Sequence, residues 1–197
     1  MLASEAVFSR ANATTRSQLG AADRVLFDRT IVEFKAYQLD DMQRQYQAFI
    51  DASLRDVAGA SQAGFVGGNF LNLMTNTIQS RNLKPATLRF YNVLQSKLDR
   101  ELASDLRKTV QYWQRDLGNP QAKELWDRDK SHIEDYKKAA QESQAQWIKF
   151  RDSCALLAIS LYRDRAGNFD PAVSMQVILT KNRIAELRSE PFAPESK

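Results

Sequence analysis

The sequence is poor in the residues that interrupt helices and in those that cross-link a chain. Seven glycines and five prolines occur in 197 residues, so long helices are favoured over many short strands joined by turns. A single cysteine excludes an intrachain disulfide. No run of about 20 apolar residues is present that could cross a bilayer as a helix. One histidine and one cysteine offer no ready set of zinc ligands, and we expect no metal and no cofactor.

The chain is mildly basic, with 28 Lys and Arg residues against 24 Asp and Glu and a formal net charge of +4. The charges are interleaved along the chain rather than gathered with aromatic residues, so nucleic acid is not an expected partner. Residues 1–17 contain no apolar segment typical of a signal peptide. We expect a periplasmic or secreted protein if a signal peptide has been removed, and a cytoplasmic one if Met1 is the native start.

Apolar residues recur at steps of three and four along several stretches, which is the pattern of amphipathic helices. These stretches are residues 19–57, 70–79, 85–117, 121–162 and 171–187. The first is one long helix or two helices joined by a kink near Gln38–Asp41. Pro85 and Pro171 suit the first turns of their helices, and Leu88 is expected in the apolar stripe that follows Pro85. The sequence predicts an all-α protein, an antiparallel bundle of three long and two or more shorter helices.

A glycine-rich segment, residues 59–69, is the candidate boundary within the chain. It has neither the spacing of a dinucleotide-binding fingerprint nor the Lys-Ser/Thr pair of a phosphate-binding loop, so a flexible connection is favoured. We expect a single helical domain over residues 1–197. The alternative is a division at this segment, with residues 1–58 as an N-terminal helical hairpin or arm and residues 85–190 as the main helical module.

The most informative segment of the chain holds Trp147, Phe150, Arg151 and Cys154 within three helical turns. On a helix these residues share one face, which we expect to be buried. Cys154 is then an inert thiol, and the Arg151 guanidinium stacks on the Trp147 indole. We expect Asp152 to pair with a charge on a neighbouring helix or to cap a loop. A buried arginine–carboxylate link of this kind fixes the register of helices more than it adds stability.

Two segments carry a family resemblance. The segment with Trp147, Phe150, Arg151, Asp152 and Cys154 resembles the W-x-x-[FY]-R-D-x-x-C signature of the LprI-type lysozyme-inhibitor family. A second segment is similar to the closing L-T-x-x-R-x-x-x-L of that family, and its matching residues are Leu179, Thr180, Arg183 and Leu187. Together they cover residues 140–188, about a quarter of the chain.

The resemblance implies a small, exported, helical bacterial protein that binds and inhibits lysozyme without a cofactor. Family members carry a second cysteine where this chain has Met175, so the disulfide that the resemblance implies is absent. Packing of Met175 against Cys154 is expected to replace it. Many lysozymes are basic, and electrostatic complementarity favours an acidic inhibitor over a chain at +4.

We therefore predict a non-enzymatic binding protein that acts by occluding a protein partner, with lysozyme as one candidate. The alternative is a helical interaction or scaffold protein of another pathway without lysozyme activity. The sequence does not point to the residues that bind the partner, and it leaves a homo-oligomer open.

Overall fold

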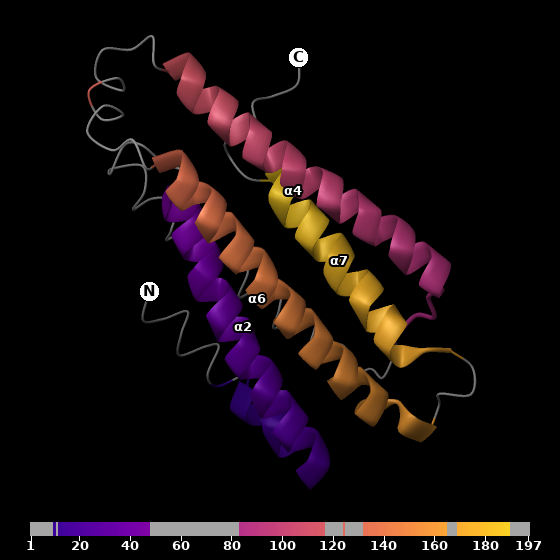
Figure 1. Cartoon of the computed structure of the whole chain (residues 1–197). Coiled ribbons are helices and arrows are strands. Elements are labelled where there is room, and N and C mark those ends of the chain that lie inside the picture. Colours follow the sequence, from indigo (N-terminus) through magenta and orange to yellow (C-terminus); the bar gives the residue numbers. More distant parts are fainter. Residues whose placement is uncertain are drawn as a thin grey trace.

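A computed structural model of the chain describes residue 10 and residues 12–47, 83–116, 124, 132–164 and 169–189 (Figure 1). Its main elements are the helices α2 (Ala21–Gln47), α4 (Leu88–Asp116), α6 (His132–Leu161) and α7 (Pro171–Ser189). Three of them have 27, 29 and 30 residues, and α7 has 19. A short helical segment at 12–17 precedes α2, and the described ranges contain no strand. The predicted all-α bundle of long and shorter helices is confirmed.

The four helices form one packed bundle in which α6 lies between α2 and α7, and α4 packs against α7 (Figure 1). α6 runs antiparallel to both of its neighbours. α4 departs from the antiparallel order and runs parallel to α7. The Ala86 amide, just before α4, donates a hydrogen bond to Ser174 Oγ near the start of α7. Further along both helices, Arg188 near the end of α7 donates to Glu101 of α4.

Aromatic rings fill the core where α2 packs against α6. The ring centroids of Phe34 and Phe150 lie 5.3 Å apart, and the Tyr37 ring stacks on Phe150 at 6.1 Å. Each such pair adds about 0.5–1.5 kcal/mol to the stabilisation that burial itself provides. This contact fixes α2 against the middle of α6.

The helix boundaries decide between two alternatives for α2 and correct the predicted start of α4. α2 is one helix that continues through Gln38–Asp41, and no kink divides it. α4 begins at Leu88 rather than at Pro85, because the Thr87 hydroxyl accepts a hydrogen bond from the Phe90 amide at 3.2 Å and caps the helix there. Leu88 is 60% exposed, so it does not belong to the buried stripe in which it was expected.

α7 begins at Pro171, as predicted. The Asp170 carboxylate accepts hydrogen bonds from the amides of Ala172 and Val173 and caps this helix. Several predicted features lie outside the described residues: the glycine-rich segment 59–69, the short helix 70–79, and the parts of the first and fourth stretches at 48–57, 121–123 and 125–131. Among the helices that are described, none is both long and apolar enough to span a membrane.

Candidate functional site

The interior of the bundle holds a group of charged side chains that come from three helices. We call it the buried charge cluster: Asp41 and Arg44 of α2, Asp105 of α4, and Arg183 and Glu186 of α7. Asp41, Arg44 and Arg183 are each only 1% exposed. Charged residues are almost never buried so completely unless they are paired, so the partners of each group decide what the cluster does.

Asp41 is the centre of the cluster and accepts four hydrogen bonds. Its carboxylate receives Arg183 Nη2 at 2.9 Å, Arg44 Nε at 3.1 Å, Ser143 Oγ at 2.7 Å and Gln45 Nε2 at 3.0 Å. Burial alone raises the pKa of Asp41, but the charges of Arg183 and Arg44 outweigh it and hold this pKa well below its ordinary value. Asp41 is therefore an ionised carboxylate that joins α2, α6 and α7.

The other terminal nitrogen of Arg183, Nη1, contacts a tyrosine–glutamate pair. Arg183 Nη1 donates to the Tyr37 hydroxyl at 2.7 Å, which donates in turn to Glu186 at 3.1 Å. The guanidinium carbon also lies 5.2 Å from the centroid of the Tyr37 ring. Burial raises the pKa of Glu186, although the charge of Arg183 opposes this shift. Burial likewise raises the pKa of Tyr37 well above its ordinary value.

Arg44 extends the cluster to α4. Its Nη1 donates to Asp105 at 3.1 Å, and the Tyr136 hydroxyl of α6 donates to the same Asp105 oxygen at 2.9 Å. Thr109 donates to Tyr136 at 3.4 Å. All four helices are therefore tied to one polar network.

The network has the chemistry of a structural lock. Removing one member of a buried ion pair costs about 3–5 kcal/mol, because the other charge stays buried without compensation. The same pairs fix the relative register of helices, since a shift of one turn breaks several of them together. The carboxylates are held by arginines and hydroxyls in a solvent-excluded interior, which leaves them poorly placed to take part in catalysis.

Arg151, the arginine singled out in the sequence, lies outside this cluster. Its guanidinium carbon is 5.2 Å from the Trp147 ring centroid and 5.8 Å from that of Tyr91, which confirms the predicted stacking on Trp147. Its Nη1 donates to Gln95 Oε1 on α4 at 3.1 Å. Arg151 therefore joins α6 to α4 through the Tyr91 ring and the Gln95 amide.

The prediction for Asp152 was wrong. Its carboxylate pairs with the adjacent Arg151 at 2.8 Å rather than with a charge on another helix, and accepts only a long bond, 3.4 Å, from the Gln176 amide of α7. Its side chain is 51% exposed, so this arginine–carboxylate link is not buried. The buried link that fixes register joins Arg183 to Asp41 instead.

The other signature residues lie inside the bundle: Trp147, Phe150, Cys154, Leu179, Thr180 and Leu187. Burial raises the pKa of Cys154 well above its ordinary value, so its thiol stays protonated and unreactive. Met175 belongs to the same buried cluster as Cys154. The Thr180 hydroxyl finds no hydrogen-bond partner among the described residues, which indicates a packing role.

Sequence reasoning missed Tyr37, Asp41 and Arg44. These residues continue, in steps of three and four, the stripe that begins with Phe27 and Phe34. The available signal was a charged pair, Asp41 and Arg44, that falls on the core stripe of a helix. Arg183 alone among the cluster residues was singled out, through the family signature.

A surface cleft of about 810 Å³ opens where the start of α4 meets α7. It is lined by Lys84, Pro85, Ala86, Thr87, Phe90, Phe169, Ser174, Val177, Ile178 and Lys181. The Lys181 ammonium lies 5.0 Å from the centroid of the Phe90 ring. Among the described residues that line the cleft, two are lysines and none is a carboxylate, so their combined charge is positive.

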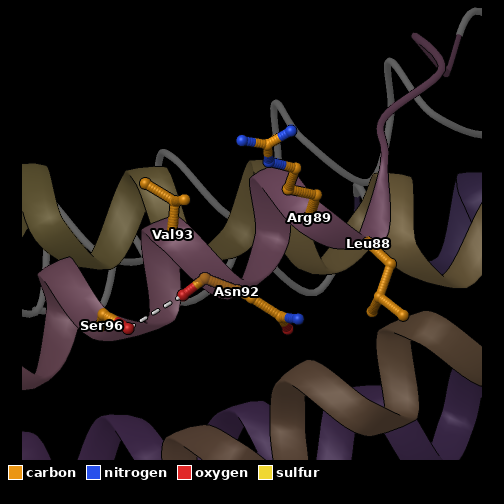
Figure 2. A pocket seen from close by; sticks show the side chains of 5 residues that line it. All are labelled: Leu88, Arg89, Asn92, Val93 and Ser96. Atoms are coloured by element: carbon orange, nitrogen blue, oxygen red, sulfur yellow. Dashed lines mark hydrogen bonds between the residues drawn. The ribbon is translucent and has the colours of Figure 1, made fainter.

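A second depression, of about 510 Å³, follows the outer side of α4. Figure 2 shows its five lining residues, Leu88, Arg89, Asn92, Val93 and Ser96, all on this one helix. Arg89 and Val93 point away from Leu88 (Figure 2). With no wall from a second described element, it does not enclose a ligand.

Within the described ranges, no three His, Cys, Asp or Glu side chains gather as metal ligands. The His132 side chain is not among those described.

Comparison of the chain with protein-family models, with curated proteins and with solved structures gives no match. The family resemblance therefore rests on the motif residues alone. The first motif also departs from its signature in one detail, since one residue rather than two separates Asp152 from Cys154.

Proposed function

We propose that this protein is a non-enzymatic bacterial binding protein, related to the LprI-type lysozyme inhibitors, that acts by occluding a protein partner. One observation carries the proposal: the two signature segments, which are far apart in the sequence, lie on α6 and α7 and pack against each other. Trp147 and Phe150 of the first segment share a buried cluster with Leu179 and Leu187 of the second. Two matches that build one structural unit are stronger support than two isolated matches.

A role in binding rather than catalysis is supported by where the reactive groups lie. The Cys154 thiol is fully enclosed, and two carboxylates with shifted pKa values, Asp41 and Glu186, are held in the buried charge cluster. Catalytic acids and bases act where a substrate can reach them. Large apolar side chains are instead exposed on the outer faces of the helices, as in Val32 and Leu39 at 65% and 67%, which favours contact with other macromolecules.

Lysozyme is the first partner to test. Purified protein added to a lysozyme turbidity assay is expected to inhibit lysis in proportion to its concentration until one equivalent is bound. Sedimentation of the mixture should show a complex over the same range. Absence of both inhibition and complex at a large molar excess would remove lysozyme as the partner. The proposal places this protein in the periplasm or outside the cell, so detection of an upstream signal peptide in the genomic reading frame would support it.

The cationic cleft favours a second candidate, an interaction protein of another pathway whose partner is acidic. Lys84 and Lys181 flank an aromatic wall formed by Phe90 and Phe169, and neither lysine has a carboxylate partner among the described ion pairs. Such a surface attracts a carboxylate-rich segment and disfavours a basic lysozyme.

The two candidates separate in one experiment. Binding of an acidic, aromatic-containing peptide should weaken at least tenfold in the double variant Lys84→Glu/Lys181→Glu, while lysozyme binding should not weaken. The matched control is Lys137→Glu/Lys138→Glu, which reverses two exposed charges on α6. Equal losses in both double variants would show that net charge, rather than the cleft, controls peptide binding.

A further inference from the structure

The outward face of α2 carries three aliphatic side chains that the bundle does not use. We call Val25, Val32 and Leu39 the outer stripe; they are 69%, 65% and 67% exposed. Successive members are seven residues apart, so they return to nearly the same face after two turns. Phe34 and Asp41 point into the bundle, which places the outer stripe on the opposite side of the helix.

Single exposed aliphatic residues are ordinary on protein surfaces, but this spacing is not scattered. An apolar residue at every seventh position of a 27-residue helix keeps to one face, as the a position of a coiled-coil seam does, although the positions three residues further on are Asp28 and Lys35. Ala22 and Ala36 lie next to the stripe and leave room for a second helix to approach closely. A flat, elongated surface of this kind packs against another helix rather than enclosing a small molecule.

The charges beside the stripe indicate which helix. Asp28 and Lys35 lie along one edge of the stripe, and Arg29 and Glu33 lie along the other. Suppose that a second copy packs its α2 antiparallel against the first, with the two-fold axis at Val32. Each residue then lies at the same height as a residue of the other copy, and the two residue numbers add to about 64. Asp28 then faces Lys35 of the second copy, and Arg29 faces Glu33 of the second copy.

These pairings are attractive on both edges, and the symmetry produces each of them twice. The Asp28 carboxylate already accepts Arg16, but its side chain is 47% exposed and a carboxylate accepts several donors. In a parallel pair, opposite edges of the stripe meet, and Asp28 lies level with Arg29 of the other copy, so these charges also attract. Charge complementarity therefore favours a second α2 as the occupant of this face, and cross-linking decides between the two arrangements.

We propose that two copies of this chain associate through the outer stripes of their α2 helices, antiparallel and with the two-fold axis at Val32. Such a pair is closed and leaves no further copy to add. Two single helices meeting face to face form a small interface, at the low end for specific association. We therefore expect a weak dimer that forms only at high protein concentration. This inference is independent of the proposed function.

Cysteine cross-linking tests the geometry directly, because the native Cys154 is fully buried and does not compete. Val32→Cys is expected to form a disulfide-linked dimer under mild oxidation at 200 μM protein. Val25→Cys alone should not, since its thiols lie far apart in the antiparallel pair. A mixture of Val25→Cys and Leu39→Cys should cross-link as a heterodimer. Cross-linking of Val25→Cys with itself would overturn the antiparallel arrangement.

Sedimentation equilibrium on the unmodified chain tests the association itself. A monomer–dimer equilibrium is expected, and Val32→Glu should weaken it at least 100-fold because each dimer would bury two unpaired carboxylates. Val93→Glu on α4, where the native valine is 58% exposed, is the matched control and should leave the constant unchanged. Helical circular dichroism checks that both variants are folded. A wild-type chain that stays monomeric up to 1 mM, or that dimerises equally well as Val32→Glu, would overturn the proposal.

Discussion

Each face of α2 carries some residues of the kind expected on the other face. The inner face buries Asp41 and Arg44 at 1% exposure, whereas the outer face leaves Val25 and Val32 about two-thirds exposed. Charge is tolerated inside because each buried group meets an opposite charge or a hydroxyl. Aliphatic surface persists outside because a second helix can cover it. The contrast shows that the inner face determines how the bundle is assembled, and the outer face determines what the assembled bundle contacts.

The largest expected effect comes from removing the centre of the buried charge cluster. Asp41→Ala leaves Arg183 and Arg44 buried beside a cavity without their shared carboxylate, and should lower the free energy of unfolding by about 3–5 kcal/mol. Urea denaturation followed by tryptophan fluorescence measures this loss. Glu134→Ala removes an exposed pair with Lys137 on α6 and is the control, with almost no expected change. Comparable losses in the two variants would contradict the assignment of the cluster as a lock.

The two carboxylates that flank Arg183 should respond to pH in opposite directions. The pKa of Glu186 is raised in the folded protein, by burial above all. Its favourable contribution is therefore present below its unfolded pKa of about 4.3 and is lost as pH rises through the folded pKa. Glu186→Gln should gain stability relative to wild type between pH 4 and pH 7, as measured by urea denaturation at both values. A constant difference across this range would contradict the shift.

The contribution of Asp41 to stability changes with pH in the opposite direction. Its pKa is lowered, because the two arginines outweigh the effect of burial. Its contribution is present above its unfolded pKa of about 3.9 and is lost as pH falls toward the folded pKa. Between pH 4 and pH 2, the free energy of unfolding of wild type should fall as Asp41 becomes protonated. Asp41→Asn should show a smaller fall, because its side chain does not titrate. A steeper acid loss in the variant than in wild type would be incompatible with an ionised Asp41.

Arg151 should matter less than Asp41, because its carboxylate partner is half exposed. Arg151→Ala removes the stacking on Trp147 and Tyr91 and the bond to Gln95, with an expected cost of about 1–2 kcal/mol. Arg151→Lys should recover only part of this loss, since an ammonium cannot stack as a guanidinium does. A loss as large as that of Asp41→Ala would place the main lock at Arg151 instead.

Helical periodicity predicted the architecture well because each long helix has a buried stripe. The start at Pro171 was predicted, but the start of α4 was not, since Thr87 rather than Pro85 supplies the cap. The same periodicity could not identify Asp41, because a search for apolar stripes passes over a charge on the core face. The pairing of Asp41 with Arg183 joins residues 142 positions apart, and a single sequence does not show which distant residues meet.

The outer stripe was overlooked for a related reason. The residues of the outer stripe fall between those of the inner stripe in the sequence. A search for one apolar face of the helix therefore ignores them. Only their exposure in the folded chain shows that α2 has two apolar faces. The parallel order of α4 and α7 was equally hidden, because it depends on contacts between helices that are not neighbours in the sequence.

The most direct test of the contrast is urea denaturation of Val32→Glu beside Asp41→Ala, at 1 μM protein, where the proposed dimer is dissociated. The account predicts that Val32→Glu unfolds within about 0.5 kcal/mol of wild type, because an exposed side chain away from structural features contributes little to the monomer. Asp41→Ala should lose several times more. A loss for Val32→Glu as large as that for Asp41→Ala would contradict the account, because both faces of α2 would then belong to the core of the monomer.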